Sequence, residues 1–529
     1  MLKNFFKVKS ATYNIMFSLY ITLFCNILFF QEVHKISKSW LFSGSMFFIV
    51  TCLMILITNI IFIKKLVKPL SIFFIILNSG SLYFMMSYKI MIDKIMLLNV
   101  IQTDVYEVID LLGWEIFVFF FITCIIPSVL ILKTNIIFSS IKNELKQKTV
   151  ISTILAMLCG IIIICDASAY KSFIRNHKYI KNYLIPANYV GAIISVTKIK
   201  LKYRKYTLTK ISEDAELIST GHKPNLVVVI IGESARTASF SLLGYERETN
   251  EPLNDFKEEL ILFKNFSSCG TSTAVSLPCI FSPYERINFI PESSKYIENV
   301  LDIMNSAGYK VIWRENNTDC KDNCNRIEIE KFCQTKECFD DIMLRNFSEK
   351  VKSTDKPTVM VMHQRGSHGP MYVNRYPKEH EIYTPICNDE NLSSCNVQSL
   401  INTYDNTIYY TSIVLRDTIK KLKSLSDEYN IALVFTSDHG ESLGENGVYL
   451  HSAFYDTAPP EQTNVPTFFW FSEGYIEDNK IDTNCLKMLY EKELSHDNIF
   501  HTLISMSNIK SAYYKKELDI LSPCKLPTM

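Results

Sequence analysis

Residues 225–236 read NLVVVIIGESAR, an uncharged apolar run followed by a glycine and a carboxylate. Runs of this length that are rich in β-branched residues are typical of strands buried on both faces of a parallel sheet. Three further short apolar runs lie at 310–313, 357–362 and 431–435. Amphipathic segments between them predict helices at 297–304 and 409–425. This order predicts an α/β domain that begins near residue 225.

Polar motifs follow most of these predicted strands. Glu233 follows the first strand, His363 and His368 follow the strand at 357–362, and Asp438 and His439 follow the strand at 431–435. Ligands of an open parallel sheet bind beyond the carboxyl ends of its strands, so these side chains are expected to share one site. An aspartate beside a histidine offers an oxygen and a nitrogen to a metal ion. Each residue alone has a structural explanation, such as a helix cap, whereas together they predict an active site.

The stretch at 269–279 reads CGTSTAVSLPC and places several hydroxyl groups between two cysteines. If these cysteines formed a disulfide, the hydroxyls would lie in a short closed loop that holds a nucleophile in place. A surface turn rich in serine and threonine is the structural alternative.

Five stretches without charged residues fill the first 165 residues, at 10–31, 39–63, 69–88, 116–132 and 149–165. Each is long enough to cross a bilayer, which takes about 20 residues and at least about 17. Counted over the N-terminus and the short loops, ten lysines lie on one side of the predicted membrane and four on the other. This bias places the N-terminus in the cytoplasm, so five crossings deliver the rest of the chain to the outside.

Ten of the fifteen cysteines follow residue 165, mostly in closely spaced pairs. An even number in this arrangement predicts disulfides in an oxidising compartment. A zinc ribbon is the weaker alternative, because no two C-x-x-C units occur at the required spacing. The formal net charge of +1 gives no indication of a nucleic-acid partner.

Several motifs together resemble the lipid A phosphoethanolamine transferases, a family that includes the mobile colistin-resistance enzymes. They are Glu233, GTSTA at 270–274, DHGESLGENG at 438–447 and PEQT at 460–463. The resemblance implies an N-terminal five-helix transmembrane bundle and an α/β periplasmic domain of the alkaline-phosphatase/sulfatase type. We expect a transmembrane domain at 1–168, an interfacial bridging helix and linker at 169–211 and a catalytic domain at 212–529. A plain linker is the alternative for the bridging segment.

The resemblance also implies roles for individual residues. Thr273 is the expected nucleophile, and the expected ligands of a tightly bound Zn²⁺ are Glu233, Thr273, Asp438 and His439. A second zinc ion or the transferring phosphate is expected at His368 and His451. Positions that contact phosphoethanolamine in the family correspond to Asn317, Thr318, Lys321 and His363. The sequence departs from the family pattern at two nearby positions. It has Ser452 where relatives commonly have glycine, and Arg365 where an apolar residue is usual.

The implied activity is transfer of phosphoethanolamine from phosphatidylethanolamine to lipid A phosphate through a threonine intermediate, with release of diacylglycerol. The expected location is the inner membrane of a Gram-negative bacterium, the expected state is a monomer, and the expected phenotype is polymyxin resistance. Three alternatives remain. They are a glycerol-phosphate transferase of the lipoteichoic acid synthase type, a transferase for another glycan or a protein, and a receptor with a degenerate hydrolase domain. A sulfatase is disfavoured because the chain has no C-x-P-x-R motif.

Asn99, Thr103 and Glu107 are spaced four residues apart and share one face of a predicted helix between the third and fourth spans. The family resemblance implies that this face is part of a donor-lipid cavity, and a solvated helix face is the alternative.

The sequence leaves the full disulfide connectivity open. The pairs that we expect are Cys269–Cys279, Cys320–Cys324, Cys333–Cys338, Cys387–Cys395 and Cys485–Cys524.

Overall fold

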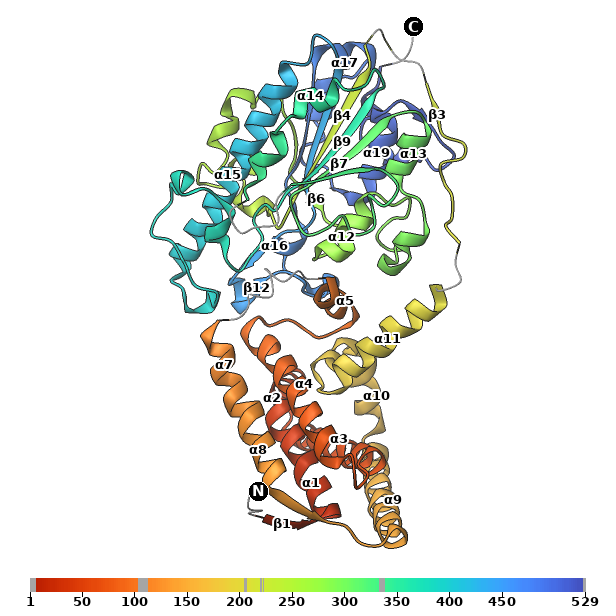
Figure 1. Ribbon diagram of the computed structural model, residues 1–529, viewed down its shortest axis with the longest axis vertical. Helices are drawn as coiled ribbons and strands as arrows, with labels where there is room; N and C mark the ends of the chain where they lie inside the picture. Colours follow the sequence, from red (N-terminus) through yellow and green to blue (C-terminus); the bar gives the residue numbers. More distant parts are fainter. Residues whose placement is uncertain are drawn as a thin grey trace. The chain divides into compact units, whose positions relative to one another are not determined.

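The computed structural model describes residues 6–102, 113–203, 207–218, 221, 223–332 and 338–526 (Figure 1). The chain divides into two compact units. The first comprises Met1–Leu97 and Leu112–Val196, and the second comprises Leu98–Leu111 and Thr197–Met529. The first unit is helical and the second contains the large sheet, so each is considered separately.

Four helical segments of the first unit are long and apolar enough to cross a membrane. They are α3 (Trp40–Ile61), α4 (Val67–Ser87), the segment Trp114–Lys133 and α9 (Ile141–Cys165). The third of these joins α7 (Trp114–Phe120) to α8 (Ile126–Lys133) through a π-helical turn. The expected fifth span is a bent pair, α1 (Ser10–Tyr20) with its π-helical turn to Cys25 and α2 (Ile27–Ser37), which meet at 63°. The membrane-spanning character of the N-terminal region is confirmed.

The bend in the first span has a local cause at Asn26. Its backbone leaves the helical region, and its buried side chain donates to the carbonyl oxygens of Ile21 and Ile185 while accepting from the Ile185 N–H. These bonds replace helical hydrogen bonds that a continuous helix would make. The uncharged sequence at 10–31 therefore contains a break that hydropathy does not reveal.

Polar side chains recur every fourth residue along this span and are buried. They are Ser10, Asn14, Ser18, Thr22 and Asn26. Asn14 donates to Asn59 Oδ1 at 2.8 Å, and the Ser18 and Thr58 hydroxyls lie 3.1 Å apart. Buried polar groups between membrane helices act as packing contacts, because each needs a partner away from water. The stripe thus fixes α1 against α3.

The basic segment after the last span is helical. It contains α10 (Ala167–Asn176), a 3₁₀ helix at Lys178–Tyr183 and α11 (Ala187–Tyr203). α10 buries Tyr170 and Phe173 and exposes Arg175 on its other side, as an amphipathic helix does. Its position at a membrane surface stays a prediction. Two short strands of this unit, β1 (Phe6–Lys9) and β2 (Thr134–Ile137), pair in parallel.

The second unit is built on a seven-stranded sheet. Its order is β5 (Ile261–Phe263), β13 (Thr467–Phe471), β10 (Asn430–Ser437), β4 (Asn225–Gly232), β9 (Thr358–His363), β7 (Lys310–Glu315) and β8 (Glu328–Lys331). The strands from β10 to β8 are parallel, and β13 is antiparallel to both of its neighbours. The four predicted apolar runs form the four adjacent strands β10, β4, β9 and β7.

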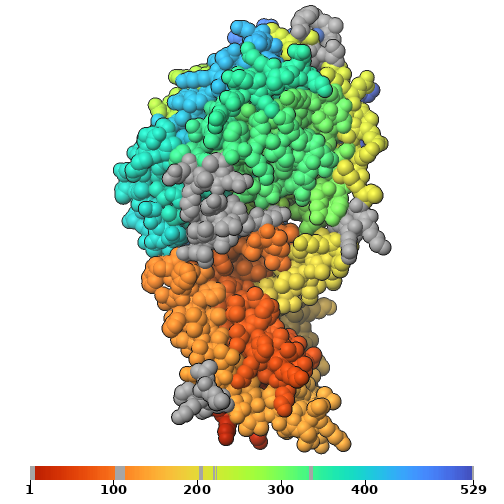
Figure 2. Space-filling model, viewed as in Figure 1, coloured from red at the N-terminus to blue at the C-terminus, as the bar shows by residue number. Residues whose placement is uncertain are grey.

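Helices cover both faces of this sheet. Val227, Val229 and Ile231 of β4 face a core shared with α12 (Thr273–Ile280), α13 (Val300–Ser306) and α19 (Ile499–Met506). Leu226, Val228 and Ile230 face a second core shared with α14 (Phe347–Val351) and α15 (Val397–Lys423). Figure 2 shows green and cyan segments packed closely over the visible face of this unit. A sheet buried on both faces explains its continuous apolar strands.

The predicted helix at 409–425 is the second half of α15, which begins at Val397. Its first half escaped prediction because polar side chains such as Asn402 and Asp405 are buried there in hydrogen bonds. Short helices and strands complete the unit. They are α16 (Pro460–Thr463), α17 (Glu473–Asp478), α18 (Thr483–Lys487), β3 (Glu216–Leu217) with β15 (Ile509–Lys510), β6 (Phe266–Ser267) with β14 (Leu494–Ser495), and β11 (Ser442–Leu443) with β12 (Tyr449–Leu450).

Candidate active site

The carboxyl ends of the central strands lie in register. Gly232 of β4 pairs with Ser437 of β10, and Ile231 pairs with His363 of β9. Glu233 and Asp438, the next residues along β4 and β10, therefore emerge side by side at one edge of the sheet. This is the arrangement that the order of strands and motifs predicts.

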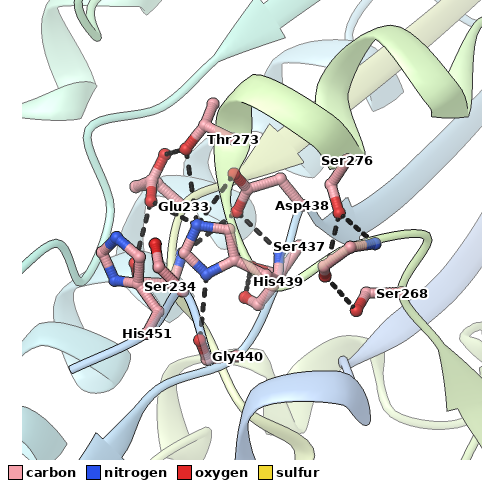
Figure 3. Close-up of polar contacts among 12 residues, drawn as sticks. Glu233, Ser234, Ser268, Thr273, Ser276, Ser437, Asp438, His439, Gly440 and His451 are labelled. Atoms are coloured by element: carbon pink, nitrogen blue, oxygen red, sulfur yellow. Dashed lines mark hydrogen bonds and ion pairs between the residues drawn. The ribbon is translucent and has the colours of Figure 1, made fainter. Parts of the chain in front are cut away.

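Thr273 is the first residue of α12 and points at this edge (Figure 3). Its Oγ1 donates to Glu233 Oε2 at 3.1 Å and lies 3.4 Å from His439 Nε2. The side chain is partly exposed, whereas Glu233 and His439 are buried. The hydroxyl is thus the group of this cluster that a substrate can reach.

Glu233, Asp438 and His439 each offer one ligand atom, and these atoms lie within 4.8 Å of one another. The His439 Nδ1–H donates to the Gly440 carbonyl at 2.9 Å, because that oxygen can only accept, and this leaves Nε2 toward the cluster. Among the described residues, Asp438 Oδ2 is buried without a hydrogen-bond partner and lies 3.3 Å from His439 Nε2. Two carboxylates and an imidazole match the ligand preferences of zinc.

The electrostatics of the cluster also fit a cation. Burial raises the pKa of Asp438 to about 6, and the negative charge of Glu233 adds to this effect. Burial alone would lower the pKa of His439, yet the charges of Asp438 and Glu233 raise it to about 10. The negative charges of the two carboxylates thus favour positive charge beside them.

A second group of possible ligands adjoins the first and contains His439, Glu441 and His451. The His451 Nδ1 lies 2.8 Å from Glu441 Oε2, and the Tyr372 hydroxyl donates to Glu441 Oε1 at 2.6 Å. A carboxylate on one imidazole nitrogen directs the other nitrogen toward a ligand. The ring of His368 lies 5.3 Å from that of His451, so the structure brings these two predicted residues together.

The roles of Glu441 and Tyr372 escaped the sequence analysis. Glu441 belongs to the motif at 438–447, and that motif was the available signal. Tyr372 lies in a 3₁₀ helix at Tyr372–Arg375 and carries no comparable signal.

The loop after β7 brings further predicted residues to the site. Asn317 Nδ2 donates to Glu233 Oε2 at 2.8 Å and lies 3.4 Å from His363 Nε2. Lys321 Nζ donates to the Thr318 hydroxyl at 3.3 Å, and only 8% of Lys321 is exposed. Lys321 also lines a cavity of about 340 Å³, together with residues that include Glu315, Asp319 and Lys331.

Glu315 is the buried partner that orients this part of the site, and sequence analysis did not identify it. It accepts hydrogen bonds from the Asn317 backbone N–H and the Trp313 indole, each at 2.8 Å, and lies 2.9 Å from His363 Nδ1. Burial alone would lower the pKa of His363, but the charge and hydrogen bond of Glu315 raise it. Glu315 is the last residue of β7, two residues beyond the end of the apolar run predicted at 310–313.

The last of the expected residues lie on the helix between the third and fourth predicted spans and in the cysteine pairs. α5 (Lys94–Gln102) carries Asn99, whose Nδ2 donates to the Ser452 hydroxyl at 3.0 Å, while Thr103 and Glu107 lie outside the described residues. Disulfides join four of the expected pairs, Cys269–Cys279, Cys320–Cys324, Cys387–Cys395 and Cys485–Cys524. The expected Cys333–Cys338 pair includes Cys333, which is also outside the described residues.

Gly366 packs directly on the backbone of Glu233. Its φ is +51°, and a Cβ atom there would lie 2.6 Å from Glu233 O and 2.8 Å from Glu233 N. We expect Gly366→Ala to destabilise the protein by about 2 kcal/mol through overpacking. Because the displaced backbone carries a predicted metal ligand, activity and zinc content should fall as well.

Gly308→Ala is the matched control, since Gly308 has a φ of +104° and nothing within 4 Å of an added Cβ. Thermal unfolding, metal analysis and activity assays of both variants separate backbone strain from displacement of Glu233. An alanine at 366 that costs stability but leaves zinc binding unchanged would contradict this interpretation.

A partly exposed threonine faces buried carboxylates and histidines at the edge of a doubly wound sheet. This arrangement places the second unit in the class of alkaline-phosphatase/sulfatase-type domains. In agreement, the family model "Sulfatase" matches residues 225–509, and the model "Phosphoethanolamine transferase EptA/EptB" matches residues 50–201.

Similar proteins cover nearly the whole chain. Phosphoethanolamine transferase EptA of Escherichia coli K12 is 33% identical over 527 residues, which are 96% of this chain and 95% of that protein. Phosphatidylethanolamine transferase Mcr-1 of Escherichia coli is 32% identical over 93% of this chain and 94% of its own length. The solved structure of the integral membrane lipooligosaccharide phosphoethanolamine transferase A (EptA) from Neisseria meningitidis matches with a TM-score of 0.94. It is 31% identical and covers 99% of this chain and 100% of that chain.

The chain belongs to the phosphoethanolamine transferase family. Both the resemblance drawn from its motifs and the predicted fold class are confirmed.

Proposed function

We propose that the chain transfers phosphoethanolamine from phosphatidylethanolamine to lipid A, with Thr273 as the nucleophile. The single observation that carries this proposal is the Thr273 hydroxyl, which donates to Glu233 and adjoins His439 at the edge of the sheet. Family membership supports the transferred group, and the name lipooligosaccharide phosphoethanolamine transferase A of a similar structure supports the acceptor class.

Zn²⁺ is the proposed cofactor, held by Glu233, Thr273, Asp438 and His439. The convergence of two buried carboxylates and a buried imidazole, together with the raised pKa of His439, supports a cation at this place. Bound zinc makes a coordinated hydroxyl more acidic and offsets negative charge on phosphoryl oxygens. His368 and His451 adjoin the cluster and are proposed to hold a second zinc ion or the transferring phosphate.

The reaction proceeds in two displacements at phosphorus. The Thr273 hydroxyl gives up its proton as its oxygen forms a bond to the donor phosphorus. The bond from phosphorus to the glycerol oxygen breaks, and this oxygen takes up a proton, so diacylglycerol leaves and the number of protons is unchanged. In the second displacement a hydroxyl oxygen of the acceptor phosphate loses its proton and attacks phosphorus, the bond from phosphorus to the Thr273 oxygen breaks, and that oxygen takes up a proton to restore the hydroxyl. Each displacement is in line, so the residues around phosphorus act by positioning and charge.

Residues of the β7 loop are proposed to bind the phosphoethanolamine group. Asn317 already contacts Glu233, and the side chains of Thr318 and Lys321 are joined by a hydrogen bond beside the cavity. The Lys321 ammonium, which is mostly buried, offers positive charge to a phosphate. His363, whose Nδ1 contacts Glu315 and whose Nε2 lies 3.4 Å from Asn317 Nδ2, is proposed to contribute a nitrogen beside them.

The proposed location is the inner membrane, with the catalytic domain in the periplasm. The apolar helices of the first unit support a membrane location. The disulfides of the second unit support the periplasm, because disulfides persist in that oxidising compartment. We propose the domain boundaries 1–168, 169–211 and 212–529 and a monomeric enzyme.

An ammonium group added to each modified phosphate lowers the negative surface charge, so expression is expected to confer polymyxin resistance.

The direct test uses the full-length chain and phosphatidylethanolamine labelled in its acyl chains. Labelled diacylglycerol should appear, and mass spectrometry of lipid A from cells with and without the gene should show an added phosphoethanolamine. Labelled phosphatidylglycerol in a parallel assay tests the glycerol-phosphate alternative. Turnover of that lipid alone would reject the proposed donor, and unmodified lipid A would redirect the search to other envelope acceptors.

Asn99, Thr103 and Glu107 are proposed to line a cavity for the donor lipid. We expect Glu107→Gln to lower turnover of phosphatidylethanolamine more than turnover of a short soluble phosphoethanolamine ester. Binding energy from remote parts of a substrate helps to position its reacting phosphate, and the short ester lacks those parts. Glu115→Gln, in the first turn of α7, is the control. Equal losses on both substrates would mean that Glu107 does not contact the lipid.

A further inference from the structure

His496 is a buried histidine that the proposed chemistry does not use. It begins the 3₁₀ helix His496–Asn498 directly after β14, and none of its surface is exposed. Burial lowers the pKa of His496 to about 3, so the ring is neutral near pH 7. A neutral imidazole has one nitrogen that donates and one that accepts, and its partners decide which is which.

Both ring nitrogens contact the backbone, and each contacts a different segment. The Cys269 N–H donates to His496 Nδ1 at 3.0 Å, and His496 Nε2 lies 3.0 Å from the Ser437 carbonyl oxygen. The same Nε2 also lies 3.3 Å from the hydroxyl of Thr436, which belongs to the same strand as Ser437. A backbone N–H can only donate and a carbonyl can only accept. The proton therefore sits on Nε2, which donates to Ser437, and the two partners fix a single tautomer.

The two anchored residues flank the reacting groups. Cys269 precedes Thr273 by four residues and is disulfide-bonded to Cys279 near the end of α12. Ser437 is the last residue of β10 and precedes Asp438 and His439. The His496 ring thus connects the segment before Thr273 to the end of β10, which two predicted metal ligands follow directly.

The other hydrogen bonds of the nucleophile loop, defined as residues 268–271, lead elsewhere. Ser268 N–H donates to the Thr463 carbonyl at 2.7 Å, and the Thr271 hydroxyl donates to the Ala453 carbonyl at 2.6 Å. Gly270 N–H donates to the Ser276 hydroxyl within α12 at 2.8 Å (Figure 3). These bonds hold the loop to the segment after the metal motif and to its own helix. His496 supplies the connection to β10.

We propose that His496 is a positioning residue, which sets the distance from Thr273 to Asp438 and His439 by holding Cys269 and Ser437 apart at a fixed separation. This inference rests on the proposed role of Thr273 as the nucleophile. In-line attack tolerates little error in the placement of the reacting atoms, and a shift of about 1 Å costs about 100-fold in rate. A side chain that never touches substrate can therefore control kcat.

Three variants of the full-length chain test the hydrogen bonds of Nδ1 and Nε2 separately. His496→Phe keeps most of the volume and removes both hydrogen bonds. His496→Asn keeps an acceptor close to the Nδ1 position, and His496→Gln keeps a donor close to the Nε2 position. We expect the phenylalanine variant to lose about 100-fold in kcat, with KM for phosphatidylethanolamine unchanged. Asparagine and glutamine should each restore part of kcat, because each restores one of the two connections.

His501→Phe is the matched control. His501 is 1% exposed, its Nδ1 accepts from the Lys515 N–H at 3.1 Å, and burial lowers its pKa to about 4. His501 lies in α19, and its ring-to-backbone contact joins that helix to Lys515, which is not part of the nucleophile loop. The two phenylalanine variants should lose similar thermal stability, and only the variant at 496 should lose kcat.

Intact-protein mass spectrometry detects the phosphoethanolamine adduct, and zinc content is measured in parallel. These measurements distinguish a failure of the proposed function from a failure of the positioning role of His496. Wild-type turnover without an adduct on Thr273 would overturn the proposed function and, with it, this inference. An adduct on wild type that forms equally fast on His496→Phe would overturn the positioning role alone. A loss of kcat in His501→Phe as large as that in His496→Phe would also overturn the positioning role. If the phenylalanine variant does not fold, full kcat in both the asparagine and glutamine variants overturns the role.

Discussion

Thr273→Ala is expected to lower diacylglycerol release from phosphatidylethanolamine by at least about 10⁴-fold, as removal of a covalent nucleophile does in other enzymes. The substitution removes the hydroxyl that contacts both Glu233 and His439. The fold should persist, because the disulfide between Cys269 and Cys279 still closes the segment 269–279. Labelled lipid measures the rate, and intact-protein mass spectrometry should find the phosphoethanolamine adduct on wild type only.

Ser272→Ala is the control for this experiment. The Ser272 hydroxyl is buried, has no hydrogen-bond partner among the described residues and does not cap α12. Its loss should leave both the adduct and the rate in place. An adduct that maps to Ser272, or normal turnover by the alanine variant at 273, would show that the nucleophile has been misassigned.

Asp438→Asn is expected to reduce zinc affinity and turnover together. The change removes the charge and basicity of one predicted ligand at nearly constant size. Changes to groups that only support a ligand cost about 10- to 100-fold in affinity, so loss of a ligand oxygen should cost at least that much. Zinc content after dialysis against a graded series of chelator concentrations, measured beside the rate of transfer, gives both quantities.

Asp405→Asn provides an unusually close control. Asp405 is also fully buried, and burial raises its pKa to about 6, as it does for Asp438. Its partners are Tyr245 and Arg247 rather than the metal cluster. The control variant should lose stability and keep its zinc. Stoichiometric zinc and a normal rate in Asp438→Asn would show that the cluster at the sheet edge is structural.

Much of the site could be predicted because its residues follow strands directly. Glu233 comes one residue after β4, and Asp438 and His439 follow β10, so the identification of these strands also locates the side chains. The strands themselves are apolar runs that local periodicity reveals. For His368, His451, Asn317, Thr318 and Lys321 the expectation came from family resemblance, since a polar residue in a loop carries no positional signal of its own.

The residues that orient this site could not be predicted in the same way. The contacts that give these residues their roles join distant parts of the chain. Glu315 contacts His363, Tyr372 contacts Glu441, and His496 contacts Cys269, and the partners in each pair lie 48, 69 and 227 positions apart. The same limit applies to Asn26, whose contact with Ile185 bends the first span. Composition reports how apolar a segment is, but it does not report which distant group satisfies a buried hydrogen bond.

The sequence by itself determined the membrane spans, the four central strands, the exported cysteines and the polar motifs at the strand ends. Each of these depends on the composition or period of a short segment, which is a local property. Only the tertiary structure decided that β13 runs antiparallel to β10, that α15 begins at Val397 and that His496 connects Cys269 to the end of β10 at Ser437. These features depend on which buried donors and acceptors meet after the chain has folded, and that pairing is set by three-dimensional packing rather than by sequence separation.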